Sequence, residues 1–245
     1  MPLVDHARRR ITVKLVLCGT GGAGKTTSLM WLHANVPARS IGSLTSIATR
    51  HDRTLFFDFV PIDAGRVGAY DIAVHLYTVP GQPRYRDARQ SVLRGADGIA
   101  HVIDSQRDRL EDNHESLRDV HLGLAEHGVE SRALPTVMHF NKRDLDPSLL
   151  LTPAELSAAL NFRGVPEYLT DAVRGAGLVE ALRGLNALVL QRLGAPAVAP
   201  VPASPSVSAT PTDAYAILPV IATPPVVTRH PTAPGGAPAV QPVSS

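Results

Sequence analysis

Two short runs of residues in this chain have the types and spacing needed to hold a nucleotide. The first run, Gly19 to Thr26, fits the phosphate-binding pattern G-x-x-x-x-G-K-[ST]. Glycines let successive backbone N–H groups curve around a phosphate, and a following helix adds the positive end of its dipole. Lys25 supplies a charge for the β- and γ-phosphates, and the Thr26 hydroxyl is placed for Mg²⁺. Gly21 has no Cβ where the γ-phosphate and an attacking water would lie. The nucleotide-binding residues expected in and beside this run are Gly21, Gly22, Ala23, Gly24, Lys25, Thr26 and Thr27.

The second run, Asn141-Lys142-Arg143-Asp144, fits the pattern N-K-x-D, whose side chains can read the edge of a guanine. Asp144 can accept hydrogen bonds from the N1–H and N2–H₂ groups of guanine, which adenine does not offer. A carboxylate left without partners in a buried site is costly, so this mismatch discriminates by roughly 10⁴ or more. Asn141 can hold the base or brace the phosphate loop, and the Lys142 stem can lie over the base plane. The two runs together predict binding of GTP and GDP.

Each run follows an apolar stretch that is typical of a buried strand. Ile11 to Cys18 is rich in β-branched residues and leads into the glycine run, and Thr26 to Asn35 then has apolar residues at helical spacing. Ala133 to Phe140 leads into the second run. Because ligands bind at the carboxyl ends of parallel strands, both runs are expected at one edge of a sheet.

The rest of the chain alternates strand and helix patterns. Candidate strands are Thr54 to Val60, Ile72 to Val79 and Gly98 to Asp104, with hairpin-like turn residues from Asp63 to Gly68. Candidate helices are Asn113 to His127, a segment that starts at the capping sequence Thr152-Pro153-Ala154-Glu155, and Leu178 to Leu193. This order predicts an α/β fold, a doubly wound, mostly parallel sheet with helices on both faces.

Composition limits the remaining classes of function. The net charge of +2 over 245 residues does not argue for a nucleic-acid partner, and the basic cluster Arg8 to Arg10 is more typical of a solvated surface. A single cysteine, Cys18, allows no disulfide framework, which suits the cytoplasm. The ten histidines form no metal-binding pattern. We find no signal peptide, long apolar span or lipidation motif, so no direct membrane anchor is expected.

Composition changes sharply after Leu193. Residues 194–245 hold 12 of the 21 prolines, and their only charges are Asp213 and Arg229. Such a segment cannot bury enough apolar surface to fold, which predicts a disordered tail rich in Pro, Ala and Val. Its P-x-x-P spacings could dock in an aromatic groove, but proline-rich tails contain such spacings by chance. The expected organisation is an N-terminal extension at 1–10, a nucleotide-binding domain at 11–193 and this tail.

With Thr78-Val79-Pro80-Gly81-Gln82 added, the chain resembles the Ras-like small GTPases, and closely resembles the MglA family of bacterial polarity and gliding-motility GTPases. The resemblance covers about residues 11–193. Its matching stretches are Gly19 to Thr27, Asp52 to Phe59, His75 to Gln82, Asp104 to Gln106, Asn141 to Leu145 and Pro166 to Tyr168.

The resemblance implies roles for further residues and for partners. Gln82 would orient the attacking water, and Arg53 would act as an arginine finger supplied in cis. Thr54 would approach Mg²⁺ or the γ-phosphate, Gly81 would report the γ-phosphate, and the Ala172 N–H would meet guanine O6. The family also implies Mg²⁺ as cofactor, a roadblock-fold activating protein called MglB, and effector proteins. The acidic residue of the usual D-x-x-G motif of Ras-like proteins is replaced by Thr78.

Three functions fit these observations to different degrees. A GTP-hydrolysing switch uses all of them, with slow turnover that an activating protein raises. A recruitment module that binds GTP with negligible hydrolysis would have no need of Gln82. An ATP-using enzyme with a phosphate loop would have no need of Asp144.

Overall fold

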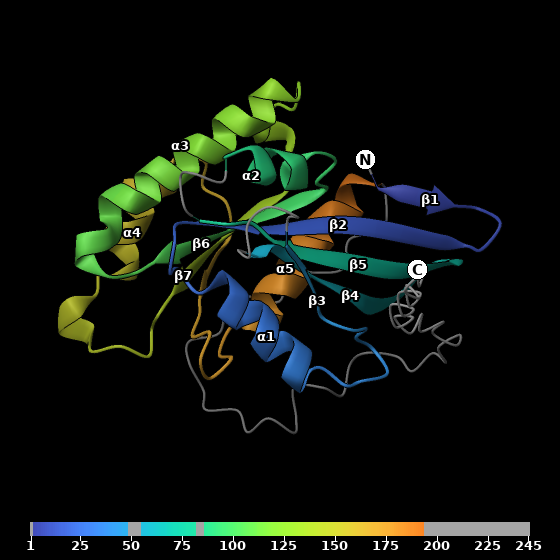
Figure 1. Ribbon diagram of the computed structural model, residues 1–245, viewed down its shortest axis with the longest axis horizontal. Helices are drawn as coiled ribbons and strands as arrows, with labels where there is room; N and C mark the ends of the chain where they lie inside the picture. Colours follow the sequence, from blue (N-terminus) through green and yellow to red (C-terminus); the bar gives the residue numbers. More distant parts are fainter. Residues whose placement is uncertain (1, 49–54, 82–85, 194–245) are drawn as a thin grey trace, which may run out of the picture.

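The computed structural model describes residues 2–48, 55–81 and 86–193, which form a central sheet covered by helices (Figure 1). Seven strands lie in the order β3-β4-β5-β2-β6-β7-β8, and β1 pairs with the beginning of β2. The strands are β1 (Leu3–Asp5), β2 (Arg10–Cys18), β3 (Thr45–Ala48), β4 (Leu55–Val67), β5 (Tyr70–Thr78), β6 (Gly98–Asp104), β7 (Thr136–Asn141) and β8 (Glu167–Leu169). The α-helices are α1 (Lys25–Asn35), α2 (Arg86–Leu93), α3 (Leu110–Glu126), α4 (Pro153–Leu160) and α5 (Leu178–Arg192).

The middle of the sheet is parallel and buried on both faces. β2 pairs in parallel with β5 on one side and with β6 on the other, and β7 and β8 continue the parallel order. Val13, Leu15 and Val16 on β2 have no exposed surface. Strands covered on both faces read as continuous apolar runs, which is why β2 and β6 were visible in the sequence.

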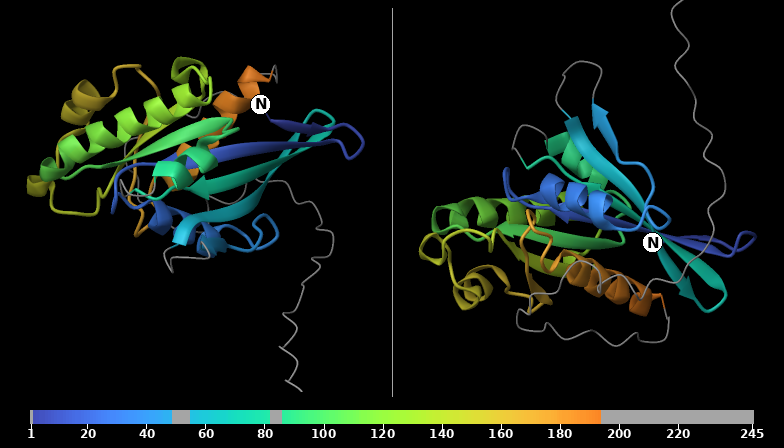
Figure 2. Two further views of the ribbon diagram at one scale, coloured as in Figure 1. Left: turned by 45° about the horizontal axis from the view of Figure 1, so that its top comes forward. Right: turned by 90° about the horizontal axis from the view of Figure 1, so that it is seen from below.

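Helices cover both faces of this sheet. α1 and α5 lie on one face, where Leu29 and Leu185 belong to the same core cluster as the β2 side chains (Figures 1 and 2). α2 and α3 lie on the other face, where Val92 and Val120 share a second cluster with Val16. The predicted doubly wound α/β class is therefore confirmed for the described residues.

One turn lies elsewhere than the sequence predicted. β4 runs on to Val67, and the hairpin turn to β5 consists of Gly68 and Ala69. The turn residues before it instead make an irregularity in the strand register between Asp63 and Arg66, with Gly65 at φ 86°. A bulge uses the same residue types as a turn, because both need a left-handed backbone position.

The expected capping sequence of α4 is confirmed. The Thr152 hydroxyl accepts from the Glu155 N–H, and the Glu155 carboxylate accepts in return from the Thr152 N–H. Within the described residues, no helix combines the length and apolar character needed to span a bilayer. The expected tail, residues 194–245, lies outside the described residues.

Candidate functional site

The phosphate loop joins the end of β2 to the beginning of α1. Gly24 precedes the helix in a left-handed conformation at φ 101°, and Gly22 has φ 78°. The Lys25 Nζ turns back along the loop and donates to the carbonyl oxygens of Gly19 and Thr20, at 2.8 and 2.7 Å. The loop is therefore closed around its own lysine, and the strand-loop-helix order that the motif requires is present.

The charge of Lys25 is held in a buried position. Its side chain is buried, and burial lowers its pKa to about 8, while Cys18 opposes this shift and Arg89 adds to it. The thiol of Cys18, at the end of β2, is also fully buried, which raises its pKa to about 12. Carbonyl oxygens do not neutralise an ammonium, so a phosphate arriving here would gain a strong electrostatic partner.

Asn141 connects the phosphate loop with the base-reading side of the site. Its Nδ2 donates to the Ala23 carbonyl at 2.7 Å, and its Oδ1 accepts from the Ala172 N–H at 3.0 Å. The Thr170 hydroxyl donates to the same Oδ1 at 3.2 Å. A Cβ on Gly24 would lie 2.2 Å from Asn141 Nδ2, so the glycine is needed for this contact. Of the two roles open to Asn141 from sequence, this geometry is that of a brace.

Lys142 and Asp144 occupy different environments in the second run. The Lys142 Nζ forms an ion pair with Asp104 Oδ2 at 2.7 Å, and Lys142 has a positive φ of 67°. Asp104 ends β6 and is 1% exposed, so this pair fixes the lysine stem. Asp144 is partly buried and has no hydrogen-bond or ion-pair partner within the described part of the chain. Its carboxylate is therefore available to a ligand.

The loop that carries Ala172 is stabilised from two sides. Asp171 Oδ1 accepts from the N–H groups of Val173 and Arg174, at 2.8 and 2.9 Å. The side chain of Trp31, on α1, lies so close to Gly175 that a Cβ there would overlap the indole ring. Ala172 itself is buried. No local pattern indicated Trp31, because its partner Gly175 lies 144 positions further along the chain.

The carboxylate of Asp58, which no sequence pattern indicated as a site residue, lies beside Thr26. Asp58, on β4, accepts from the Thr26 hydroxyl at 2.9 Å and from the Ser46 hydroxyl at 2.9 Å. Thr78 Oγ1 donates to the same carboxylate at 3.1 Å and accepts from the Asp58 N–H at 3.0 Å. Asp58 is 6% exposed, between Phe57 and Phe59. A buried acid among aromatic residues in a strand is the signal that could have identified it.

These oxygen donors fit a hard cation such as Mg²⁺. Mg²⁺ takes one or two protein ligands beside phosphates and waters, so a full cage of side chains is not required. No group of three or more His, Cys, Asp or Glu side chains gathers as a metal site in the residues that the structure describes. The hydroxyl of Thr26 and the carboxylate of Asp58 would hold the ion and its water shell.

Two further residues of the predicted site, Gly81 and Thr27, lie in the described part of the chain. Gly81 packs against the phosphate loop, where a Cβ would lie 2.4 Å from the Gly21 N and 2.5 Å from the Thr20 carbonyl carbon. Thr27 is exposed on α1. Arg53, Thr54 and Gln82 lie outside the described residues.

A phosphate loop and an N-K-x-D loop at one edge of this sheet define the class of guanine-nucleotide-binding P-loop proteins. The chain is 41% identical over 193 residues to the mutual gliding-motility protein MglA of Myxococcus xanthus strain DK1622, a match that covers 79% of this chain and 98% of that protein. It therefore belongs to the MglA family of small GTPases. No protein-family model matches the chain.

Proposed function

We propose that the protein is a Mg²⁺-dependent molecular switch that binds GTP and hydrolyses it to GDP and phosphate. The observation that carries this proposal is the position of the Asn141 side chain, which joins the phosphate loop at Ala23 to the base loop at Ala172. One residue thus sets the distance between the part that would hold phosphates and the part that would hold guanine. Asp144, unpaired among the described residues, supports the choice of guanine.

Different residues of the chain would bind the phosphates and the metal ion. The backbone of Gly21 to Gly24 and the Lys25 ammonium would bind the phosphates, with Thr26 and Thr54 directed to the metal. Bound Mg²⁺ would neutralise charge on the β- and γ-phosphates. Asp58 would orient the Thr26 hydroxyl through their hydrogen bond, in the place of the acid that Thr78 replaces.

Catalysis would rest on positioning and charge. Gln82 would orient the attacking water, and Arg53 would stabilise charge that develops on the transferring phosphoryl group. Gly81 lies against Gly21, where the γ-phosphate is expected, so GTP would move Gly81 and the segment after it. Such a displacement would distinguish GTP from GDP, as a switch requires.

Phosphate release under single-turnover conditions, with GTP and ATP compared side by side, tests the proposal. Gln82→Ala and Arg53→Ala should each reduce GTP hydrolysis while affinity for GTP stays within a few fold, because both act on the transition state. An arginine finger contributes roughly 10³ or more in rate, so the loss for Arg53→Ala should be largest with an activating protein present. No measurable hydrolysis by the wild type with a purified activator would instead favour the recruitment module.

The name of the Myxococcus xanthus relative, mutual gliding-motility protein MglA, indicates a cellular role for this chain. We infer a role in cell polarity or gliding motility, in the cytoplasm, with a roadblock-fold MglB-type protein as activator and effectors that recognise the GTP state. Gly21→Val should block turnover by placing a branched side chain beside the γ-phosphate. Affinity capture with this variant and with the GDP-bound wild type should therefore give different partners, and identical partner sets would argue against a switch.

The domain division is also part of the proposal. Residues 11–193 would form the GTPase domain, residues 1–10 an extension of it, and residues 194–245 a disordered tail. Removal of residues 198–245 should leave the melting temperature and nucleotide affinity nearly unchanged, since such a segment buries little surface. A fall of several degrees would show that the tail packs on the domain.

A further inference from the structure

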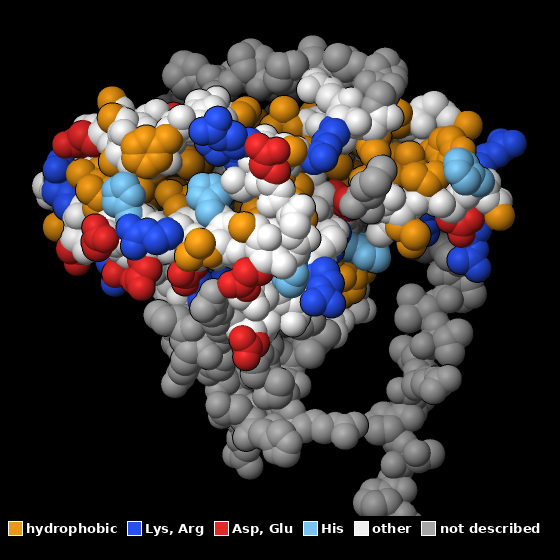
Figure 3. All heavy atoms as spheres, turned by 90° about the horizontal axis from the view of Figure 1, so that it is seen from above, with side chains coloured by type: hydrophobic (Ala, Val, Ile, Leu, Met, Phe, Trp, Pro, Cys, Tyr) orange, Lys and Arg blue, Asp and Glu red, His pale blue; other side chains and the backbone are white. Residues whose placement is uncertain are grey.

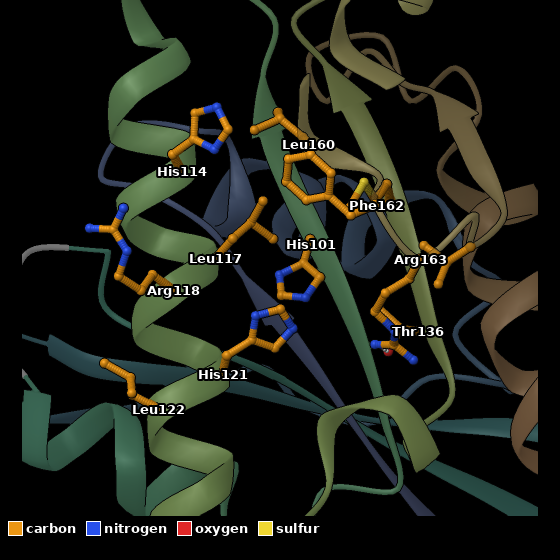
Figure 4. Close-up of a pocket in the computed structure, with 12 residues that line it drawn as sticks. His101, His114, Leu117, Arg118, His121, Leu122, Thr136, Leu160, Phe162 and Arg163 are labelled. Atoms are coloured by element: carbon orange, nitrogen blue, oxygen red, sulfur yellow. Dashed lines mark hydrogen bonds between the residues drawn. The ribbon is translucent and has the colours of Figure 1, made fainter. Parts of the chain in front are cut away.

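A cavity of about 310 Å³ lies between α3 and the segment that joins α4 to β8 (Figure 4). Its lining includes none of the residues assigned above to phosphate, base or metal. The size is near the lower end for small-molecule sites, which span about 300–1,000 Å³. The cavity is therefore separate from the proposed nucleotide site.

The walls come from three elements with regular spacing. α3 contributes His114, Leu117, Arg118, His121 and Leu122, which share one helical face because they are three or four positions apart. β6 and β7 form the floor with His101, Thr136 and Met138, and the segment after α4 closes the third side with Phe162, Arg163 and Val165. Figure 4 shows the His101 and His121 rings next to each other, with Phe162 and Arg163 on the opposite wall.

The apolar part of the lining is large and partly open to solvent. Met138 and Leu160 are buried, whereas Leu122 is 51% exposed and Phe162 is 80% exposed. His114 and Phe162 stack across the opening, with ring centroids 6.5 Å apart. On the face that carries α3, hydrophobic, histidine and basic side chains gather in one area (Figure 3). Such an apolar wall suits the body of a small organic molecule.

The polar part of the lining is positive. Arg163 is fixed in place, because its guanidinium donates to Thr136 Oγ1 at 3.1 Å and to the carbonyls of Arg132 and Leu134. Neither Arg163 nor Arg118 has a carboxylate within ion-pair distance in the described ranges. Acidic side chains also appear on this face in Figure 3, but none of the residues that line the cavity is acidic.

His101 gives a second indication of a ligand. Its side chain is 3% exposed, lines the cavity, and has no hydrogen-bond partner among the described residues. Burial, and to a lesser extent the charges of His121, Arg163 and His139, lower its pKa to about 3. Its imidazole therefore presents unpaired ring nitrogens to the cavity, which a polar group of a ligand can meet.

We propose that this cavity binds a small organic carboxylate, with its apolar body against Leu117, Met138 and Phe162 and its carboxylate toward Arg163. A carboxylate fits because guanidinium groups hold it by charge-assisted hydrogen bonds, and because the lining offers it no repulsion. A neutral ligand would leave the Arg163 guanidinium without a counter-charge. A cationic ligand would be repelled.

Octanoate is the probe, tested on the GDP-bound full-length protein. The chain has three methionines, so ¹³C-methyl labelling gives few signals, and that of Met138 reports the cavity. Met30, exposed on α1, serves as the internal control. Octanoate should shift the Met138 signal saturably and leave Met30 unchanged, with a Kd of about 0.1–1 mM for a ligand of this size. 1-Octanol should bind at least about tenfold more weakly, and octylamine should not bind.

Matched variants separate the cavity from general effects. Arg163→Gln should weaken octanoate binding about fivefold or more, and Leu122→Glu should abolish it by placing a carboxylate at the opening. Arg8→Gln and Leu149→Glu make the same changes at exposed positions outside the lining, and should have no effect. Leu122, Arg8 and Leu149 are exposed, so the fold should persist in their variants. An unchanged melting temperature checks the fold of Arg163→Gln, whose side chain is half-buried. An unchanged Met138 signal at 10 mM octanoate would overturn the proposal. Equal affinity for octanol, or full binding by a folded Arg163→Gln, would do so as well.

Discussion

Arg109 reaches across 88 residues of sequence to donate a hydrogen bond from Nη2 to the carbonyl oxygen of Gly21, at 3.1 Å. The same guanidinium pairs with Asp112 at 2.6 Å and lies 3.9 Å from Asp104. Asp104 in turn holds Lys142. A single buried carboxylate therefore lies between the base-reading run and the residue that anchors the phosphate loop. The C=O and N–H of a peptide point in opposite directions, so this anchor also sets the direction of the Gly22 N–H.

Arg109→Gln should speed the release of GDP. The lost hydrogen bond is partly exposed, so we expect an effect of about 1 kcal/mol, or about fivefold in rate. Release of a fluorescent GDP analogue, followed after adding excess GDP, measures this rate. Arg107→Gln is the matched control, because Arg107 lies in the same short turn but pairs with Glu155. Equal rates for the two variants would show that the contact with Gly21 is unimportant.

Asp58→Asn should raise the Mg²⁺ concentration needed for half-maximal GTP binding, by about tenfold. An amide cannot provide the charge that attracts the ion and its waters, although its shape is conserved. Nucleotide affinity measured over a Mg²⁺ titration gives this midpoint. Asp63→Asn removes a charge from the same strand, where the Asp63 carboxylate accepts from the Gly65 N–H. The assignment of Asp58 fails if both variants titrate like the wild type.

Asp144→Asn should weaken GTP binding by about 100-fold or more and raise the relative affinity for xanthosine triphosphate. The amide no longer accepts from both N1–H and N2–H₂, but it can donate to the additional carbonyl of xanthine. Fluorescence titration with both nucleotides measures the change. Asp146→Asn, two positions further on, affects only the cap of a short turn and should keep wild-type affinities. Wild-type GTP affinity in Asp144→Asn would exclude it as the guanine reader.

Nucleotide binding at pH 8.5 should take up protons through Lys25. In the free protein burial lowers its pKa to about 8, so part of the population is neutral at this pH. Phosphates favour the charged form and raise the pKa, so binding adds protons at pH 8.5 and adds almost none from this group at pH 6.5. Calorimetry in buffers of different ionisation enthalpy counts these protons. In Lys25→Arg, which stays charged, any remaining binding should show no uptake at pH 8.5.

Local patterns predicted the parts of the fold that depend on local chemistry. The glycine run sits between β2 and α1, and the Thr152 cap begins α4, as expected from residue types alone. β1 was not predicted, because three residues carry too little pattern to distinguish a strand from a loop. The turn before β5 was placed too early, because the residues near Gly65 serve a bulge as readily as a turn.

The site was harder to predict where contacts connect distant residues. Asp58 meets Thr26 only because antiparallel β4 passes the beginning of α1, 32 positions away in sequence. Arg109 and Trp31 also act across long separations, which no local spacing reveals. Thr78 stands where related proteins have an acid, which indicated that a carboxylate was missing. Asp58, which takes its place on the neighbouring strand, could be identified only once the pairing of β4 with β5 was known.

The burial of Cys18 has a practical consequence for experiments on this protein. At a pKa of about 12, only on the order of one thiol in 10⁴ to 10⁵ is a thiolate near neutral pH, and the fold also blocks access to it. Cys18 is the chain's sole cysteine, so one cysteine introduced at the surface, for example Leu149→Cys, should accept a maleimide dye at a single place in the otherwise unaltered sequence. Slow reaction of Cys18 itself would then report unfolding of the sheet that encloses it.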